Sequence, residues 1–371
     1  MKQIIKKLLL HGVFPVYYRL LARRPVRRRN VFLEIRYPQL TDNLQLLHAA
    51  CRKQRDYRTE TFFLKVGQGS LAQYTRRCLA MIRCIADAER IFVDESSNVL
   101  SALPIRPETK IIQAWHACGA FKRFGHGLPD GPEEAYYNRY ALVTVSAEEV
   151  VDKYCESMRQ PRDVVRALGV SRTDRFFDPA FLAAARKRVE AAVPDLGGRK
   201  LVLYAPTFRG NVAAAELPQM PDIRRLCEAL GDKYVFVYRG HPAVKERPAV
   251  PRECRDFFRD VTDLLTTEDC LCRADVCITD YSSLVFEFAL LERPMLFYVY
   301  DIDRYDRDRG FYYPFRSFAP GPICRDTDEL LAAFASLPEQ ADERVRAFRE
   351  RFMGACDGHA TERILQAIEQ L

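Results

Sequence analysis

The sequence lacks any apolar run close to the roughly 20 residues that a membrane-spanning helix requires. The longest candidate, residues 8–18, is interrupted by His11 and Pro15 and lacks a small-residue cleavage site, so we expect neither a membrane span nor a signal peptide. With 17 glycines and 21 prolines in 371 residues, a collagen-like or low-complexity chain is excluded. The hydrophobic content of 48% is that of a globular protein, and the length predicts two domains.

Several common signatures are also missing. The chain has no G-x-G-x-x-G after a predicted strand, no Walker loop and no G-x-S-x-G elbow. Its twelve cysteines are scattered, and the one close pair, Cys270 and Cys272, has no second pair at zinc-site spacing, so we expect reduced thiols and no structural metal. The aspartates within 301–308 lack EF-hand spacing, and the interleaved arginines favour ion pairs. The sequence therefore requires no cofactor, although a divalent metal is compatible with it.

Positive charge is concentrated at the start of the chain. The net charge is +7, whereas residues 1–30 alone carry three Lys and six Arg and no acidic residue. A basic end on a nearly neutral body is unlike a nucleic-acid-binding domain, so we expect no nucleic-acid partner. Apolar residues mixed with cations over 3–21 are typical of a helix on an anionic membrane surface, and Pro15 is expected to kink or split it. The alternative is a first helix that packs on the core, followed by a solvated basic linker.

Strand and helix patterns alternate along the remaining chain, which predicts an α/β protein with parallel sheets. The predicted strands are 31–35, 61–66, 88–93, 110–115, 141–145, 200–204, 234–239, 275–279 and 294–298. The predicted helices are 42–55, 71–86, 180–200, 222–230, 283–291, 326–336, 339–352 and 360–371. A turn at 194–198 separates two similar halves. We therefore assign 1–30 to a membrane-associating segment, 31–198 to an N-terminal and 199–371 to a C-terminal Rossmann-like domain, with the final helix able to pack back on the N-terminal domain.

Polar residues gather where predicted strands end, which is the edge at which open α/β sheets bind ligands. A helix that begins at Ser282–Ser283 offers unpaired backbone N–H groups to an anion, although a serine that only caps the helix is the simpler alternative. The polar residues at neighbouring strand ends are Thr207, Arg209, Arg239 and His241. Together with the serines they predict a site for an anion of the size of pyrophosphate.

Two of the six histidines, His116 and His241, directly follow predicted strands. An imidazole at a strand end that faces a cleft is well placed for proton transfer near neutral pH. A purely structural histidine is the alternative, but the position of these two favours function.

Four stretches make the sequence similar to a known family. They are QAWHACGAFKRFG (113–125), LYAPTFRG (203–210), YRGHP (238–242) and ADVCITDYSSLVFEFALLERPMLFYVYDIDRYDRDRGFYY (274–313). Through them the chain resembles the CDP-glycerol glycerophosphotransferase family, which includes the teichoic acid primases and polymerases. Shorter echoes lie at 169–179 and 357–368. Ala117-Cys118 stand where the family often has Gly-Thr, which leaves the acceptor open.

The resemblance implies a GT-B-like fold of two Rossmann-type, doubly wound domains with an active site in the cleft between them. It implies transfer of glycerol or ribitol phosphate from a CDP-activated donor to a hydroxyl of a lipid-linked acceptor, such as an undecaprenyl-linked one. CMP would leave, and the product would be teichoic acid or a capsular polymer. A peripheral location on the cytoplasmic face of a bacterial membrane follows, and it gives the basic N-terminal segment a role.

The resemblance also assigns roles by position. His116 matches the family's proposed general base, and His241 matches a second histidine, which we assign to the donor phosphates. The residues expected to contact or line the phosphate pocket are Thr207, Arg209, Arg239, Ser282 and Ser283. Glu287 and Asp280 are assigned to the ribose or nucleotide by analogy with other GT-B enzymes. Arg172 and Asp174 are assigned to support of the cleft.

Two other functions fit parts of the pattern. A GT-B glycosyltransferase that uses a nucleotide sugar would employ the same sheet ends and Glu287. A membrane-associated scaffold with a decayed cleft is a non-enzymatic alternative, but the intact set of His116, His241, Ser282 and Ser283 argues against it. Glycerol and ribitol donors, and addition of one unit or of many, are equally compatible with the sequence.

Overall fold

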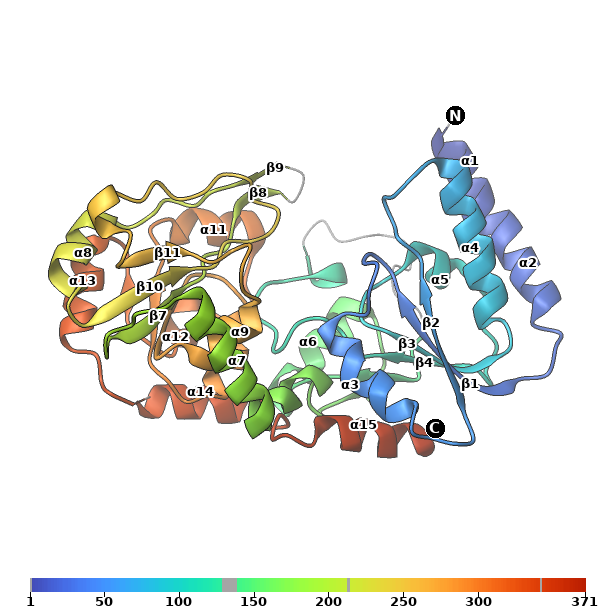
Figure 1. The fold of residues 1–371 in the computed structure, drawn as a ribbon. Coiled ribbons are helices and arrows are strands. Elements are labelled where there is room, and N and C mark those ends of the chain that lie inside the picture. Colours follow the sequence, from blue (N-terminus) through green and yellow to red (C-terminus); the bar gives the residue numbers. More distant parts are fainter. Residues whose placement is uncertain (1, 129–138, 212–213, 341) are drawn as a thin grey trace. The chain divides into compact units, whose positions relative to one another are not determined.

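The computed structural model describes residues 2–128, 139–211, 214–340 and 342–371 (Figure 1). Its contacts divide the chain into two compact units. Unit 1 comprises Met1–Ala117, Phe124–Asp174 and Gly354–Leu371, and unit 2 comprises Cys118–Arg123 and Arg175–Met353. The division at 174/175 differs from the boundary at 198/199 expected from the sequence. The physical reason is that α7 (Pro179–Ala192) packs on α9 (Thr267–Arg273), where Arg188 donates to Asp269 over 2.6 and 2.9 Å.

Unit 1 is built on a six-stranded parallel sheet with the order β2-β1-β3-β4-β5-β6. Its strands are β1 (Arg27–Glu34), β2 (Arg58–Phe63), β3 (Ala88–Val93), β4 (Lys110–Gln113), β5 (Leu142–Thr144) and β6 (Val165–Arg166). Its helices after the N-terminal segment are α3 (Asp42–Cys51), α4 (Leu71–Ile85), α5 (Asn98–Ala102), α6 (Val151–Met158) and α15 (Ala360–Glu369). The central strands are buried apolar runs, as expected for a parallel sheet covered on both faces.

The last helix, α15, lies in unit 1, although residues 343–353, the helix before it, belong to unit 2. Its apolar residues Ile364 and Ile368 join a core cluster with Phe32, Phe92 and other strand residues. Asp174 caps this helix, because its carboxylate accepts hydrogen bonds from the backbone N–H groups of Ala360 (2.9 Å) and Thr361 (2.8 Å). Asp174 therefore has a structural task, namely to hold the C-terminal helix.

The N-terminal segment forms α1 (Lys2–Leu8), a π-helical turn (Leu9–Val13) and α2 (Phe14–Leu21). Pro15 lies in the first turn of α2, where its missing N–H costs little. Phe14 and Tyr18 are buried, and α2 runs beside α4 and α5 (Figure 1). This segment thus packs on unit 1 through one face. Within the described ranges no helix is both long and apolar enough to cross a bilayer.

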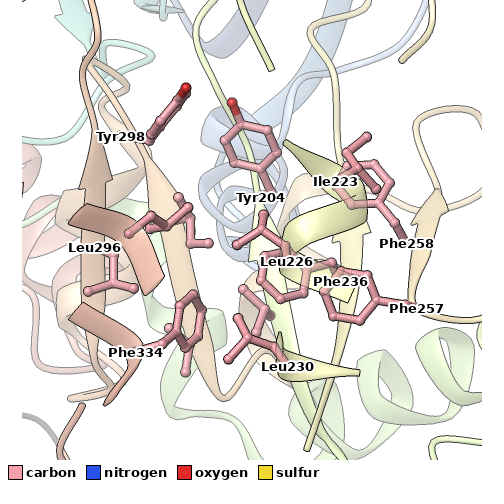
Figure 2. Packing of buried hydrophobic residues seen from close by; sticks show 14 of the residues in the cluster. Tyr204, Ile223, Leu226, Leu230, Phe236, Phe257, Phe258, Leu296, Tyr298 and Phe334 are labelled. Carbon is pink, nitrogen blue, oxygen red and sulfur yellow. The ribbon is translucent and has the colours of Figure 1, made fainter. Parts of the chain in front are cut away.

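Unit 2 contains a second six-stranded parallel sheet with the order β11-β10-β7-β12-β13-β14. Its strands are β7 (Lys200–Tyr204), β10 (Tyr234–Tyr238), β11 (Phe258–Asp260), β12 (Val276–Thr279), β13 (Met295–Tyr298) and β14 (Ile323–Cys324), and β8 (Arg209–Asn211) and β9 (Ala214–Glu216) form a separate hairpin. Its helices besides α7 and α9 are α8 (Ile223–Leu230), α10 (Leu284–Ala289), α11 (Ile302–Arg309), α12 (Phe315–Phe318), α13 (Thr327–Ala335) and α14 (Glu343–Met353). Aromatic and aliphatic side chains from the sheet, α8 and α13 form one core cluster, part of which Figure 2 shows.

The predicted alternation of strands and helices is confirmed in both units. The Asp-rich stretch, for which the sequence predicted no secondary structure, forms helix α11. Arg304 and Asp308 make the expected kind of internal ion pair at 3.7 Å, whereas Asp301 pairs with the distant Arg209.

Candidate functional site

His116 lies just beyond β4, at the carboxyl edge of the sheet of unit 1. The chain turns there because Trp115 adopts a left-handed conformation (φ 49°), and its N–H donates to the buried Gln113 Oε1 at 2.9 Å. The imidazole Nδ1 is 3.0 Å from the backbone oxygen of Asp94, which follows the adjacent strand β3. Since a carbonyl can only accept, Nδ1 carries the proton in the neutral ring, and Nε2 has the lone pair. The side chain of His116 is 42% exposed, so a substrate can reach it.

The loop that carries His116 is held by charged and polar neighbours. Arg172 Nη1 donates to the backbone oxygen of His116 (2.8 Å) and to Asn43 Oδ1 (2.7 Å). Asn43 Nδ2 in turn donates to the Asp94 carboxylate (3.2 Å), which also accepts from the Thr41 hydroxyl. Burial raises the pKa of Asp94. Arg172 therefore supports the histidine loop within unit 1.

The second candidate site lies at the carboxyl edge of the sheet of unit 2. There the neighbouring strands β10, β7, β12 and β13 end together, so the segments that follow them meet. Phe208 and His241 pack with ring centroids 4.7 Å apart. Burial lowers the pKa of His241, and the cations Arg239 and Lys122 lower it further.

Asp280 stabilises the loops at this edge through hydrogen bonds within the protein. Its side chain is only 2% exposed. Its Oδ1 accepts from the backbone N–H groups of Thr207 (2.8 Å) and Tyr281 (2.6 Å), and its Oδ2 accepts from Arg209 Nη1 (3.0 Å). A carboxylate with these three donors fixes the loops after β7 and β12 relative to each other.

Arg209 is enclosed by acidic and aromatic side chains. Its guanidinium donates to both oxygens of Asp301, at 2.6 and 2.9 Å, in addition to Asp280. It also lies 5.1 to 5.3 Å from the ring centroids of Tyr281, Tyr300 and Tyr305. Burial opposes its charge, but the paired carboxylates raise its pKa overall. The sequence could not show this, since Asp301 is 92 positions away.

Two polar atoms at the same edge are buried without a hydrogen-bond partner in the described part of the chain: Thr207 Oγ1 and Arg239 Nε. Buried polar groups are nearly always paired, so such atoms mark a place where a ligand or water completes the hydrogen bonding. Ser282 Oγ accepts weakly from Leu284 N–H at 3.4 Å, and Ser283 precedes α10 without capping it through its side chain. Glu287 is buried within that helix.

Lys122 is a residue of this site that the sequence reasoning missed. The segment Cys118–Arg123 belongs to unit 2, where Phe121 stacks on Phe311 and Phe318 with centroid separations of 4.4 and 4.2 Å. The Lys122 ammonium group lies 5.6 Å from the centroid of the Tyr305 ring. The sequence did contain a signal for Lys122, because this residue lies in the same motif as His116, at 113–125.

The described residues contain no group of three or more His, Cys, Asp or Glu side chains arranged to hold a metal ion. The cysteines are free thiols, and burial raises the pKa of both Cys270 and Cys272 to about 12. The close pair of cysteines is therefore part of the core of unit 2.

Comparison with known proteins relates the chain to enzymes of cell-wall polymer synthesis. Residues 16–370 match the family described as CDP-Glycerol:Poly(glycerophosphate) glycerophosphotransferase. The chain is 34% identical to the teichoic acid ribitol-phosphate primase of Bacillus spizizenii over 97% of this chain and 96% of that protein. It is 35% identical to the teichoic acid poly(ribitol-phosphate) polymerase of the same organism over 99% of this chain, and it spans 60% of the length of that polymerase.

The fold is similar to that of the wall teichoic acid polymerase TagF, with a TM-score of 0.76, 21% identity and coverage of 99% of this chain and 95% of that one. This likeness confirms the predicted fold class, a GT-B-like pairing of two Rossmann-like α/β domains.

Proposed function

Because the chain belongs to the CDP-glycerol:poly(glycerophosphate) glycerophosphotransferase family, we propose that it transfers a polyol phosphate from a CDP-activated donor to a hydroxyl of a lipid-linked acceptor in teichoic acid synthesis. In this reaction the acceptor oxygen forms a bond to the β-phosphorus of the donor. The bond between that phosphorus and the bridging oxygen breaks, and CMP leaves with the bond electrons. The single observation that carries the proposal is the unpartnered Thr207 Oγ1 and Arg239 Nε at the strand ends of unit 2 in a chain of this family.

His116 is the general base of the proposed reaction. Its Nδ1–H is held by Asp94, so Nε2 is available to take the proton of the acceptor hydroxyl as the oxygen attacks. A general base of this kind contributes about 10²- to 10⁴-fold to the rate. His116 belongs to unit 1, and the residues assigned to the donor belong to unit 2.

The donor diphosphate is bound at the carboxyl edge of the sheet in unit 2. Thr207 Oγ1 and Arg239 Nε supply a hydroxyl and a charged N–H, and His241 lies beside them next to Phe208. Ser282 and Ser283 add hydroxyls and backbone N–H groups before α10. In phosphoryl transfer the protein mainly orients groups and stabilises spread negative charge, which this set of donors can do. Glu287 remains our candidate for the ribose.

Arg209 and Asp280 contribute to this site as braces. Both charges are occupied by protein partners, and Asp280 is almost fully buried. We therefore place them behind the donor, where they fix the loop that carries Thr207.

We propose ribitol phosphate as the transferred group ahead of glycerol phosphate. The primase and the polymerase named above both have ribitol phosphate in their names, at 34% and 35% identity, whereas the teichoic acid glycerol-phosphate primase of Bacillus subtilis is 30% identical over 76% of this chain.

The N-terminal helical segment binds the membrane that holds the acceptor. Opposite its buried residues Phe14 and Tyr18, it exposes more than half of each of four apolar side chains. These are Ile4, Leu8, Val16 and Leu20. They recur at multiples of four positions and are interspersed with cations, the pattern of an interfacial helix on an anionic surface. An I4Q/L8Q variant should lose flotation with vesicles containing anionic lipid but keep CMP release with a detergent-solubilised acceptor. Undiminished flotation would contradict the membrane role.

The function is tested with the full chain, CDP-ribitol or CDP-glycerol and a short lipid-linked acceptor. We expect CMP release and a product heavier by one or more ribitol phosphate units in the mass spectrum. H116A should abolish release, whereas the control H359A, at an exposed histidine next to α15, should not. Failure of every CDP-polyol, or turnover only with UDP-sugars, would overturn the proposal in favour of the scaffold or glycosyltransferase alternatives.

A further inference from the structure

The dipeptide Asp94-Glu95 follows β3 and lies against the segment that carries His116. β3 and β4 are paired up to Val93 and Gln113, and Ala114 N–H donates to the Val93 oxygen at 2.8 Å. Asp94 uses its backbone oxygen to hold the His116 ring, and its own carboxylate is tied to Thr41 and Asn43. The next residue, Glu95, brings its Oε1 to 3.9 Å from the same ring nitrogen, Nδ1.

We propose that Glu95 is a positioning residue for His116, which balances the positive charge that the imidazole gains when Nε2 accepts the proton of the acceptor hydroxyl. The inference rests on the proposed function, because it takes His116 as the base. It assigns the two neighbours different tasks. The Asp94 backbone fixes the tautomer and orientation of the ring, and the Glu95 carboxylate supplies the charge.

The low exposure of Glu95 and its ion pair with Arg36 keep its side chain in this position. Its side chain is 15% exposed, and its Oε2 pairs with Arg36 Nη2 at 2.9 Å. Arg36 itself is mostly exposed, so solvent screens its effect on the imidazole more than it screens that of Glu95. An opposite charge within about 4–6 Å favours the charged form of a titrating group, and Glu95 meets this condition.

The other charged groups around the ring do not replace it. Among the described residues, the Asp94 carboxylate and Arg172 also interact with His116, and the Arg172 guanidinium donates to its backbone oxygen. Both hydrogen bonds of the buried Asp94 carboxylate go to Oδ2, and burial raises the pKa of Asp94, which disfavours its charged form. Arg172 is positive and therefore opposes protonation of the ring. Glu95 is thus the negative group of unit 1 that is best placed to stabilise the imidazolium.

The test compares E95Q, E95D and the control E362Q. Glu362 is a matched control, because it lies 3.9 Å from His359 Nδ1 but on the surface. In E95Q we expect kcat to fall about tenfold with little change in KM for donor or acceptor, since the defect is in proton transfer. The acidic limb of the pH–rate profile should move to lower pH, because the removed carboxylate no longer stabilises a positive charge on the base. E95D should recover part of kcat, and E362Q should behave as wild type.

Unchanged kcat together with an unchanged acidic limb in E95Q would overturn the inference. A fall in kcat with no shift of the acidic limb would also overturn it, because that result indicates a merely structural role for Glu95. Circular dichroism of E95Q shows whether it is folded, and E95D supplies the pH profile if it is not. The H116A variant distinguishes failure of the role assigned to Glu95 from failure of the proposed function. If H116A keeps its activity, the base is wrong, whereas an inactive H116A with a normal E95Q refutes only the role of Glu95.

Discussion

Replacing Arg209 by methionine tests whether this arginine stabilises the loops of unit 2, which we call the brace role, or binds the donor phosphate. Methionine keeps much of the length and the apolar stem of arginine but removes its charge. In R209M, Asp280 and Asp301 lose their shared cation, and Asp280 is almost fully buried. Breaking a buried pair by removing one partner costs about 3–5 kcal/mol, because the other charge is left without compensation. The brace role therefore predicts a large loss of stability, in addition to weaker donor binding.

The assay is urea unfolding followed by far-ultraviolet circular dichroism. With a urea m-value of about 3 kcal/mol per M, a loss of about 4 kcal/mol lowers the midpoint of the unit 2 transition by about 1.3 M. The double variant R209M/D301N should be destabilised by less than the sum of the two single variants, since the residues share one interaction. The control R225M removes an exposed ion pair with Asp328 and should leave the midpoint unchanged.

The opposite pattern would refute the brace. If R209M unfolds at the wild-type midpoint but binds CDP-ribitol far more weakly, Arg209 contacts the donor directly, and its pairing with Asp301 must open when the donor binds.

Three further predictions concern the site and its supports. G119A should lower the thermal midpoint, because Gly119 has φ 62° and an added Cβ would collide with the Phe286 ring, whereas G197A, at φ 58° with no neighbour within 4 Å, should cost less. D174A should cost about 1–2 kcal/mol and speed hydrogen exchange in the first turn of α15, and slow exchange there would contradict the capping role. The lowered pKa of His241 leaves its ring neutral near pH 7. Because the negative charge of the donor favours the protonated ring, donor binding should be accompanied by proton uptake. Calorimetry in buffers of different ionisation enthalpy detects this uptake. H241Q should abolish this uptake.

Most of the fold could be predicted because buried parallel strands are visible as short apolar runs. Strands β3 and β7 match their predicted ranges, and the predicted helix starts fall within a few residues of those of α3, α4, α8 and α15. Several of the elements that were not predicted lack such a pattern. Strands β6 and β14 have two residues each, and helix α11 carries charges at most positions, so neither period 2 nor period 3.6 is apparent. The division between units also depends on packing, since α7 joins unit 2 through Arg188 and Asp269.

The location of the candidate site could be predicted from the sequence, but not which of its residues are free to bind a ligand and which are paired within the protein. Residue type and position relative to a strand placed Thr207, Arg209, Arg239 and Asp280 at one edge, because parallel strands end together. Whether a charged residue at that edge is free for a ligand depends on partners that the local sequence does not reveal. Asp301, Tyr281 and Tyr305, which all lie in the 274–313 motif, enclose Arg209 within unit 2. Residues of this motif therefore occupy a cation that its position after β7 alone would suggest is free for a ligand.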